Sequence, residues 1–352
     1  MATSRLTACC RVLFEEGADA TRRCLWEVGL DRKIALEEHF AIEETLSDSL
    51  GFVPPSHQPE LKARLLDIHD KRLGQMDAHG IETMILSLNA PAVQAITDTR
   101  RAAEIARRAN DAIAESIAKR PDRFRAFAAL AMQDPDGATR ELERCVGELG
   151  FVGALVNGFS EIGDRAVYYD LPEYRPFWAV VERLGVPFYL HPRNPLPRMA
   201  PIYDGHPWLY GPTWAFGQET AVHALRLMCS GLFDEHPALT IIIGHLGEGL
   251  PYSLWRIDHR NGWLELPPTY PAKRLIADYF RENFYLTTSG NFHTPTLADA
   301  VIEIGAERVL FSCDWPFENV DHAANWFDAA EISEADRQKI GRANAARLFK
   351  LD

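Results

Sequence analysis

Residues 186–191 read VPFYLH and residues 239–244 read LTIIIG, two short runs that are apolar on both faces. Runs of this kind are typical of buried parallel strands, whereas a half-exposed strand alternates apolar and polar side chains. Six further runs share this character: 33–38 (KIALEE), 83–88 (TMILSL), 124–130 (FRAFAAL), 153–157 (GALVN), 284–288 (FYLTT) and 309–313 (VLFSC). The sequence therefore predicts eight buried strands.

Segments with helical periodicity separate these runs. Between residues 100 and 119 apolar residues recur every three or four positions, and Pro121 ends the pattern. Comparable segments cover 61–78, 135–148, 172–184, 217–230, 272–282, 295–304 and 334–349. Alternating strands and helices predict an α/β protein, and eight such units favour a single (β/α)8 TIM barrel. A doubly wound open sheet is the alternative, but no G-x-G-x-x-G motif follows a predicted strand.

We place the barrel at residues 33–352 and treat residues 1–32 as an N-terminal extension outside the fold. The first 32 residues lack the apolar core of a secretory signal, and acidic residues such as Glu15, Glu16, Asp19 and Glu27 argue against a mitochondrial targeting peptide. The six cysteines show no disulfide spacing and no Cys-x-x-Cys pair. We therefore expect reduced thiols and a cytoplasmic location.

The composition narrows the range of partners. The 352 residues include 37 Lys and Arg against 50 Asp and Glu, which gives a formal net charge of −13. Nucleic-acid binding requires a clustered basic face, which this balance argues against. No apolar run approaches the ~18 residues that a membrane span needs. We expect neither nucleic acid nor membrane as a partner.

Two connections are longer than a link between a strand and a helix requires: residues 41–60 and residues 192–216. The second is rich in aromatic residues, among them Trp208, Tyr210, Trp214 and Phe216. Long loops in a compact domain are commonly functional, and barrel active sites lie at the carboxyl ends of the strands. We expect both loops to wall a pocket there.

Chemically reactive residues lie where four of the predicted strands end: Glu37 and His39 close the first, His191 ends the fifth, His245 ends the sixth with Glu248 three residues later, and Asp314 ends the eighth. Side chains alternate along a strand, so Glu37 and His39 project together while Glu38 points elsewhere. Taken singly, a histidine at a strand end is commonly a structural core residue, and Asp314 can cap the following helix.

The combination of these residues points to a bound cation. Burying Glu37, His39, His191 and Asp314 near one another costs several kcal/mol unless a compensating charge is present. A divalent cation supplies that charge, and four such ligands leave room for water or substrate, as catalytic sites do. The sequence therefore predicts a metal site at one rim of the barrel.

Four motifs carry a family resemblance: EEHF at 37–40, FYLHPRNP at 188–195, GHLGE at 244–248 and FSCDWPFE at 311–318. They resemble the metal-dependent decarboxylase branch of the amidohydrolase superfamily, which is aminocarboxymuconate-semialdehyde decarboxylase-like, and within it the decarboxylases of dihydroxybenzoates. Hydrolytic members of the superfamily have His-x-His on the first strand and a carbamylated Lys on the fourth. This chain has Glu37-x-His39, and its fourth predicted strand ends in Asn157 without a Lys. Both departures favour one metal over two.

The resemblance implies a cofactor and its ligands. It implies one divalent metal ion held by Glu37, His39, His191 and Asp314, with Mn²⁺ favoured over Zn²⁺ and no organic cofactor. The ligand types alone leave the metal open, because imidazole suits zinc and carboxylate suits manganese.

The resemblance also implies a reaction, the non-oxidative and reversible decarboxylation of an ortho-hydroxybenzoate, with 2,6-dihydroxybenzoate giving resorcinol as the expected case. We take Asp314 as the proton donor to the ring, with His245 and Glu248 setting its protonation. The residues that the resemblance places around this small aromatic carboxylate are Phe52, Asn157, Phe216 and Arg256. Without the resemblance, Arg256 is interpreted as a solvated helix residue and both phenylalanines as packing residues. A homo-oligomer, expected to be a tetramer, is implied too.

Two other functions are compatible with the same residues. A mononuclear hydrolase of a lactone or amide would use the metal to activate a water molecule. A metal-binding barrel without catalysis would instead use residues 192–216 as a partner interface. The product distinguishes the first from a decarboxylase, and the absence of phenolic-acid binding would identify the second.

Overall fold

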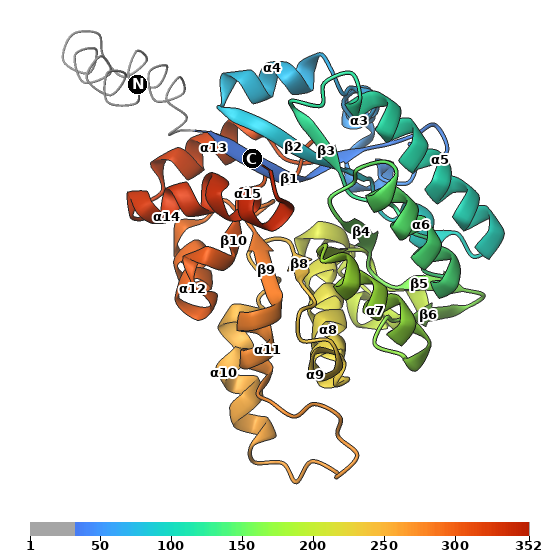
Figure 1. The fold of residues 1–352 in the computed structure, drawn as a ribbon, viewed down its shortest axis with the longest axis vertical. Helices are drawn as coiled ribbons and strands as arrows, with labels where there is room; N and C mark the ends of the chain where they lie inside the picture. The colour runs from blue at the N-terminus through green and yellow to red at the C-terminus, as the bar shows by residue number, and fades with distance from the viewer. Residues whose placement is uncertain (1–31, 352) are drawn as a thin grey trace.

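Eight parallel strands form the centre of the computed structural model, which describes residues 32–351 (Figure 1). In chain order they are β1 Lys33–Phe40, β2 Ile81–Leu88, β3 Phe124–Ala126, β4 Ala154–Asn157, β7 Phe188–His191, β8 Ile241–Ile243, β9 Phe284–Thr287 and β10 Val309–Leu310. Each lies within one of the predicted strand regions or extends it by two residues at most. A short antiparallel hairpin, β5 Ser160–Ile162 and β6 Arg165–Val167, follows β4.

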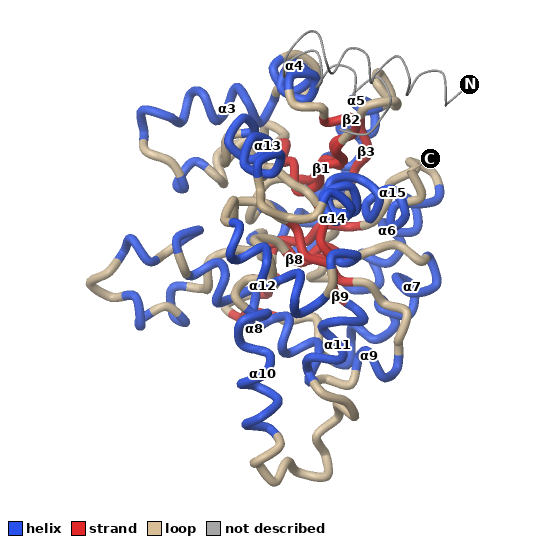
Figure 2. The backbone as a smooth tube through the Cα atoms, turned by 90° about the vertical axis from the view of Figure 1, so that its left-hand side faces the viewer, coloured by secondary structure: helices blue, strands red, loops and turns tan. Residues whose placement is uncertain are grey.

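The strands close into a barrel. Their ladders form two sheets, β1-β2-β3 and β10-β9-β8-β7-β4. On one side Ala128, just after β3, pairs in parallel with Ala154 of β4. On the other side the N–H of His39 donates to the carbonyl of Trp315, at 2.6 Å. The predicted (β/α)8 barrel is confirmed, and Figure 2 shows the strands at the centre with helices around them.

The helices that surround the strands within residues 32–351 are α3 Gln58–Leu66, α4 Lys71–Ala78, α5 Thr99–Ile117, α6 Pro135–Gly147, α7 Arg175–Leu184, α8 Ala215–Cys229, α9 Leu232–Glu235, α10 Leu250–Asn261, α11 Ile276–Asn283, α12 Thr294–Ile304, α13 Val320–Ala329, α14 Glu334–Gln338 and α15 Asn344–Phe349. The prediction of one helix over 61–78 is wrong, because α3 and α4 are separate. Between them the carboxylate of Asp67 accepts the backbone N–H groups of Asp70 and Arg72. This local bonding starts a new helix at Lys71.

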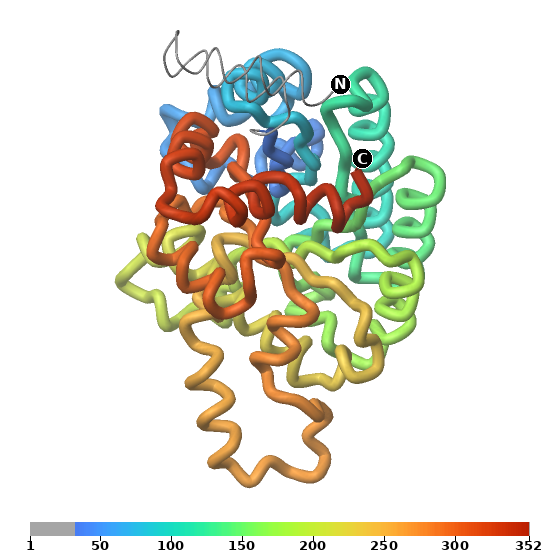
Figure 3. Tube along the Cα trace, turned by 60° about the vertical axis from the view of Figure 1, so that its left-hand side comes forward, coloured from blue at the N-terminus to red at the C-terminus, as the bar shows by residue number. Residues whose placement is uncertain are grey.

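Helices α9, α10 and α13 have no counterpart among the predicted helices. In α10 the buried residues are only Leu250, Pro251 and Leu254, so the helix lacks a continuous apolar stripe. Helix α10, residues 262–275 and α11 extend away from the barrel as one arm, drawn in orange at the bottom of Figure 3.

Two packed layers position the strands. Inward-facing residues such as Leu36, Tyr189 and Ile242 form one cluster with Phe349 of α15, which covers that part of the barrel interior. Their neighbours on the strands face outward into the larger cluster beneath the helices, as alternation along a strand requires. The polar residues discussed next lie at the carboxyl ends of the same strands.

Three further expectations concern the chain as a whole. Across residues 32–351, no helix combines the length and apolar character that crossing a bilayer requires. Cys145, Cys229 and Cys313 are free thiols, and Cys313 is buried in the larger core cluster, where its side chain is part of the packing. The expected extension at residues 1–32 lies outside the described residues except for Arg32.

Candidate metal centre and active site

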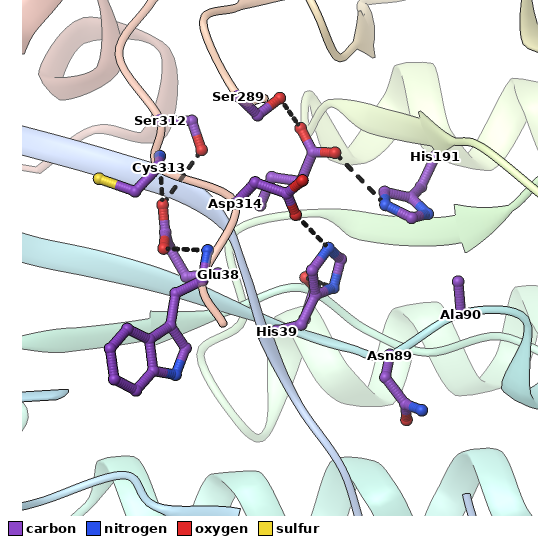
Figure 4. A network of polar contacts seen from close by, with 12 residues as sticks. Glu38, His39, Asn89, Ala90, His191, Ser289, Ser312, Cys313 and Asp314 are labelled. Carbon is purple, nitrogen blue, oxygen red and sulfur yellow. Dashed lines mark hydrogen bonds and ion pairs between the residues drawn. The ribbon is translucent and has the colours of Figure 1, made fainter. Parts of the chain in front are cut away.

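Three strand ends bring the predicted ligands together at the carboxyl end of the barrel (Figure 4). Nε2 of His191 lies 3.3 Å from Oε1 of Glu37, and Nε2 of His39 lies 3.4 Å from Oδ1 of Asp314. Candidate ligand atoms of Glu37, His39 and His191 lie within 4.8 Å of one another, as do those of Glu37, His245 and Asp314. We call these five residues the polar cluster.

The polar cluster contains buried atoms that have no hydrogen-bond partner among residues 32–351. Nδ1 of His191 is one of them, and the other three are Oε1 of Glu37, Nε2 of His39 and Oδ1 of Asp314. Such atoms are costly to bury unless something satisfies them. Because these carboxylate oxygens and Nε2 of His39 converge, a divalent cation is the group that fits them. The residues present therefore fit the metal that the sequence predicts.

Hydroxyl groups hold the other oxygen of Glu37. Oε2 accepts hydrogen bonds from Tyr189, Ser289 and Thr287, the last at 3.1 Å. This arrangement turns Oε1 towards His191. Burial would raise the pKa of Glu37, but the imidazoles of His245, His191 and His39 outweigh it and hold this pKa well below its usual range. The group is therefore a carboxylate, the form that binds a cation.

The two histidines of the predicted ligand set, His39 and His191, each turn Nε2 towards a carboxylate of the cluster. Nδ1 of His39 lies 3.2 Å from the hydroxyl of Ser87, so Nε2 is the nitrogen that faces Asp314. Burial lowers the pKa of His191, and the nearby His39 lowers it further, against the opposing effect of Glu37. A neutral imidazole is the form that ligates a metal.

His245 links Glu248 to Asp314. Its Nδ1 lies 2.7 Å from Oε1 of Glu248, and its Nε2 lies 3.9 Å from Oδ2 of Asp314 and 3.8 Å from Oε1 of Glu37. Burial would lower the pKa of His245, but the carboxylates of Glu248 and Glu37 raise it well above its usual range. This histidine therefore holds a proton beside Asp314.

Several of these residues adopt a left-handed backbone. The φ angles are 73° at Glu37, 54° at His245, 53° at Glu248 and 65° at Asp314. A non-glycine residue reaches this region only at a cost, and such positions gather at functional sites. At Glu37 the pairing of β1 with β2 shifts register between Leu36 and Glu38, so a bulge contributes to the direction of its side chain.

Glu38 points away from the cluster, as predicted. Its carboxylate accepts hydrogen bonds from Ser312, Cys313 and Trp315, and the side chain is fully buried. Burial raises its pKa to about 8, against the opposing effects of those backbone N–H groups and the Arg72 guanidinium. No pattern in the sequence singles out this residue as functional.

A cavity of about 840 Å³ adjoins the polar cluster. Its lining includes Phe216, His245, Glu248, Arg256, Asp314 and Glu318. Arg256 is exposed and makes no hydrogen bond or ion pair with the other residues of the described chain. A free cationic side chain, an aromatic ring and the predicted proton donor thus share one space.

Two of the predicted substrate-binding residues, Phe52 and Asn157, do not line this cavity. Phe52 reaches the site through an edge contact with Phe216, with ring centroids 5.2 Å apart. Asn157 ends β4 opposite His191, and its amide donates to the carbonyl of Asn89 at 3.1 Å, while its Oδ1 is buried without a partner. Their contact with substrate stays a prediction.

Sequence reasoning missed the residues that orient the cluster. Tyr189 lies two positions before His191 on the same strand, and the polar run TTSG at 287–290 begins at the last residue of β9. Period-two alternation places Tyr189 on the face of His191, which was an available signal. Nothing in the local sequence signals Ser87 or Glu38.

Comparisons with known proteins identify the family and its most similar members of known activity. The amidohydrolase family pattern matches residues 39–351. A gamma-resorcylate decarboxylase of Rhizobium sp. (strain MTP-10005) is 74% identical over 322 residues, which cover 91% of this chain and 98% of that protein. The crystal structure of 2,6-dihydroxybenzoate decarboxylase complexed with 2,6-dihydroxybenzoate superposes with a TM-score of 0.89 at 73% identity, covering 91% of this chain and 100% of that one. A dihydroxybenzoic acid decarboxylase from Polaromonas sp. JS666, with bound manganese and the inhibitor 2-nitroresorcinol, gives a TM-score of 0.89 at 72% identity and covers 91% and 97%.

Proposed function

The chain belongs to the amidohydrolase family, and from this membership we infer that it is a metal-dependent carboxy-lyase that converts 2,6-dihydroxybenzoate to resorcinol and CO2. The observation that carries this function is the polar cluster beside a cavity that holds one unpaired cationic side chain, Arg256. That arrangement suits an anionic aromatic acid. The close relatives named above are decarboxylases.

We propose Glu37, His39, His191 and Asp314 as the residues that hold one Mn²⁺ ion. Their convergent and otherwise unpartnered atoms support this assignment. A divalent ion held there would supply positive charge that offsets the negative charge of the substrate's carboxylate and phenolic groups. Tyr189, Thr287 and Ser289 keep Glu37 turned towards that position.

The chain's own residues bind and place the aromatic ring. Phe216 offers its ring as a packing surface and is itself braced by Phe52. Arg256 faces the cavity and donates charge-assisted hydrogen bonds to the anionic acid.

Proton transfer proceeds from Asp314. The carboxyl O–H of Asp314 breaks as a C–H bond forms at the ring carbon that bears the carboxylate. The C–C bond then breaks, its electron pair returns to the ring, and CO2 leaves, so that aromaticity is restored and no free aryl anion forms. His245, which holds a proton 3.9 Å from Asp314, restores the proton, and Glu248 orients the imidazole.

A panel of substrates tests the function. We expect the Mn²⁺-loaded protein to release CO2 from 2,6-dihydroxybenzoate and to form resorcinol, measured by CO2 trapping and by chromatography. The panel includes 2,3-dihydroxybenzoate, salicylate and a simple aryl lactone. Acid release from the lactone without CO2 release from any hydroxybenzoate would identify a hydrolase instead.

Replacing Arg256 by Ala is expected to raise KM for 2,6-dihydroxybenzoate about 10- to 100-fold, the value of one hydrogen bond to a charged group. The effect on kcat is expected to be smaller, because the proton donor is untouched. The matched control is Arg260→Ala, one turn further along α10, where the guanidinium is also exposed. Equal KM values for the two variants would remove Arg256 from substrate binding.

We propose a homo-oligomer, a tetramer, whose contacts involve the arm formed by α10, residues 262–275 and α11. Tyr252, Trp255 and Trp263 on this arm are 86%, 70% and 73% exposed. Exposed aromatic patches of this kind are typical of protein interfaces. Trp255→Glu is expected to lower the mass measured by light scattering, whereas Ile302→Glu on α12, 80% exposed, serves as the control. An unchanged mass for Trp255→Glu would argue against this interface.

We further propose that the enzyme works in the cytoplasm and that residues 1–32 lie outside the barrel. The three free thiols support the first proposal. The family pattern begins at residue 39, which supports the second.

A further inference from the structure

We propose that Glu38 is a positioning residue, whose buried carboxylate fixes the backbone on both sides of Asp314 and thereby aims that side chain into the polar cluster. The proposal rests on the proposed function, in which Asp314 is a metal ligand and proton donor. Glu38 itself is buried and does not line the cavity, so it acts through Asp314 rather than on substrate.

Three hydrogen bonds carry the inference (Figure 4). Oε1 of Glu38 accepts the hydroxyl of Ser312 at 3.1 Å and the N–H of Cys313 at 2.8 Å. Oε2 accepts the N–H of Trp315 at 3.1 Å. Cys313 and Trp315 are the neighbours of Asp314 in the sequence. The carboxylate of Glu38 therefore binds the backbone immediately before and immediately after Asp314.

The backbone at Asp314 needs such support. Its φ of 65° lies in the left-handed region, which a non-glycine residue keeps only where surrounding contacts impose it. The carbonyl of Asp314 accepts the N–H groups of Phe317 and Glu318, at 2.9 and 3.0 Å. Those bonds fix the chain after Asp314, and the Glu38 carboxylate fixes both of its flanking amides. Without that carboxylate, two buried N–H groups would lose their acceptor.

Glu38 also ties two parts of the site together. It lies on β1 between Glu37 and His39, while Asp314 follows β10, the last strand of the barrel. The same strands meet where the N–H of His39 donates to Trp315. Arg72 strengthens this junction, because it donates to the carbonyl of His39 at 2.6 Å and its guanidinium lies 5.3 Å from the centre of the Trp315 ring. Glu38 therefore holds the Asp314 segment in register with the ligands of β1.

The decisive variant is Glu38→Gln, which keeps the size of the side chain. Its amide has one oxygen, and its NH2 group must face the N–H of Cys313 or Trp315, so one of the two flanking bonds is lost. We expect Mn²⁺ affinity, measured by titration with electron paramagnetic resonance detection, to fall about 10- to 100-fold. We expect kcat to fall by a similar factor and KM to change by less than about threefold, since the substrate-binding wall is intact.

Three further variants serve as comparisons for Glu38→Gln. Glu82→Gln on β2 removes a carboxylate that pairs with Arg342 at 2.7 Å, away from the cluster, and is expected to leave Mn²⁺ affinity unchanged. Ser312→Ala removes only the hydroxyl bond, so we expect a loss below about threefold. Glu38→Asp keeps the carboxyl group but shortens its reach, and we expect a loss of at least about tenfold in Mn²⁺ affinity.

Each outcome decides the proposal. A folded Glu38→Gln protein with Mn²⁺ affinity and kcat within about threefold of the parent overturns it. If Glu38→Gln does not fold, the same titration of Glu38→Asp decides, with the same limit. If neither folds, Glu38 serves the fold rather than the aim of Asp314, and the inference is wrong. If the parent protein binds Mn²⁺ but decarboxylates no hydroxybenzoate, the proposed function fails, while the titrations still test Glu38.

Discussion

The Asp314→Asn protein is expected to bind Mn²⁺ and yet to lose decarboxylation almost completely, with kcat reduced at least about 10³-fold. General acid catalysis by a positioned side chain contributes about 10²- to 10⁴-fold, and an amide has no acidic proton to transfer. The amide keeps an oxygen in the place where Oδ1 of Asp314 faces His39. Glu37, His39 and His191 remain to hold the ion.

Two measurements on one preparation check this expectation: bound manganese by elemental analysis and initial rates of CO2 release. The matched control is Asp321→Asn at an exposed position on α13, which is expected to keep the parental rate. A folded, manganese-loaded Asp314→Asn protein that works at nearly the parental rate would remove Asp314 from proton transfer. Loss of both metal and rate would assign Asp314 to metal binding alone.

The His191→Ala protein is expected to lose the metal, and turnover with it. His191 is buried, and its Nε2 lies 3.3 Å from the unpartnered Oε1 of Glu37. Removing the imidazole leaves fewer ligands and a hole in which water competes for the ion. The affinity for Mn²⁺ is expected to fall at least about 100-fold, so that dialysis removes the manganese. Losses of about 10- to 100-fold are typical even for residues that only hydrogen-bond to a metal ligand.

Adding Mn²⁺ in large excess is expected to restore part of the His191→Ala activity, because Asp314 and His245 are unchanged. His293→Ala serves as the control, since this exposed imidazole hydrogen-bonds to the hydroxyl of Thr296 at 2.8 Å, outside the polar cluster. Full manganese content in dialysed His191→Ala would show that the ion is held by the other triple, Glu37, His245 and Asp314.

The sequence sufficed for the barrel and for the members of the polar cluster because both depend on simple patterns. Runs that are apolar on both faces predicted all eight strands, and residues that follow parallel strands meet at one end of a barrel. Glu37, His39, His191 and Asp314 were therefore expected to converge, and the structure brings their ligand atoms together.

The finer geometry depends on contacts between distant segments, which local patterns do not encode. The hydroxyls that hold Glu37 come from β7 and from the end of β9. The left-handed backbone at Glu37 and Asp314 is imposed by a register shift and by a carboxylate on another strand. Helix α10 was missed because its exposed aromatic residues conceal the helical period.

The cavity is far roomier than a single benzene ring with three substituents requires, at about 840 Å³. Its outer walls come from α8 and α10, whereas the polar cluster is anchored on the barrel strands. Substrate recognition by α8 and α10 and the chemistry at the strand ends thus depend on different parts of the chain. Laboratory evolution directed at the outer walls can broaden the range of accepted acids while leaving the chemical machinery intact.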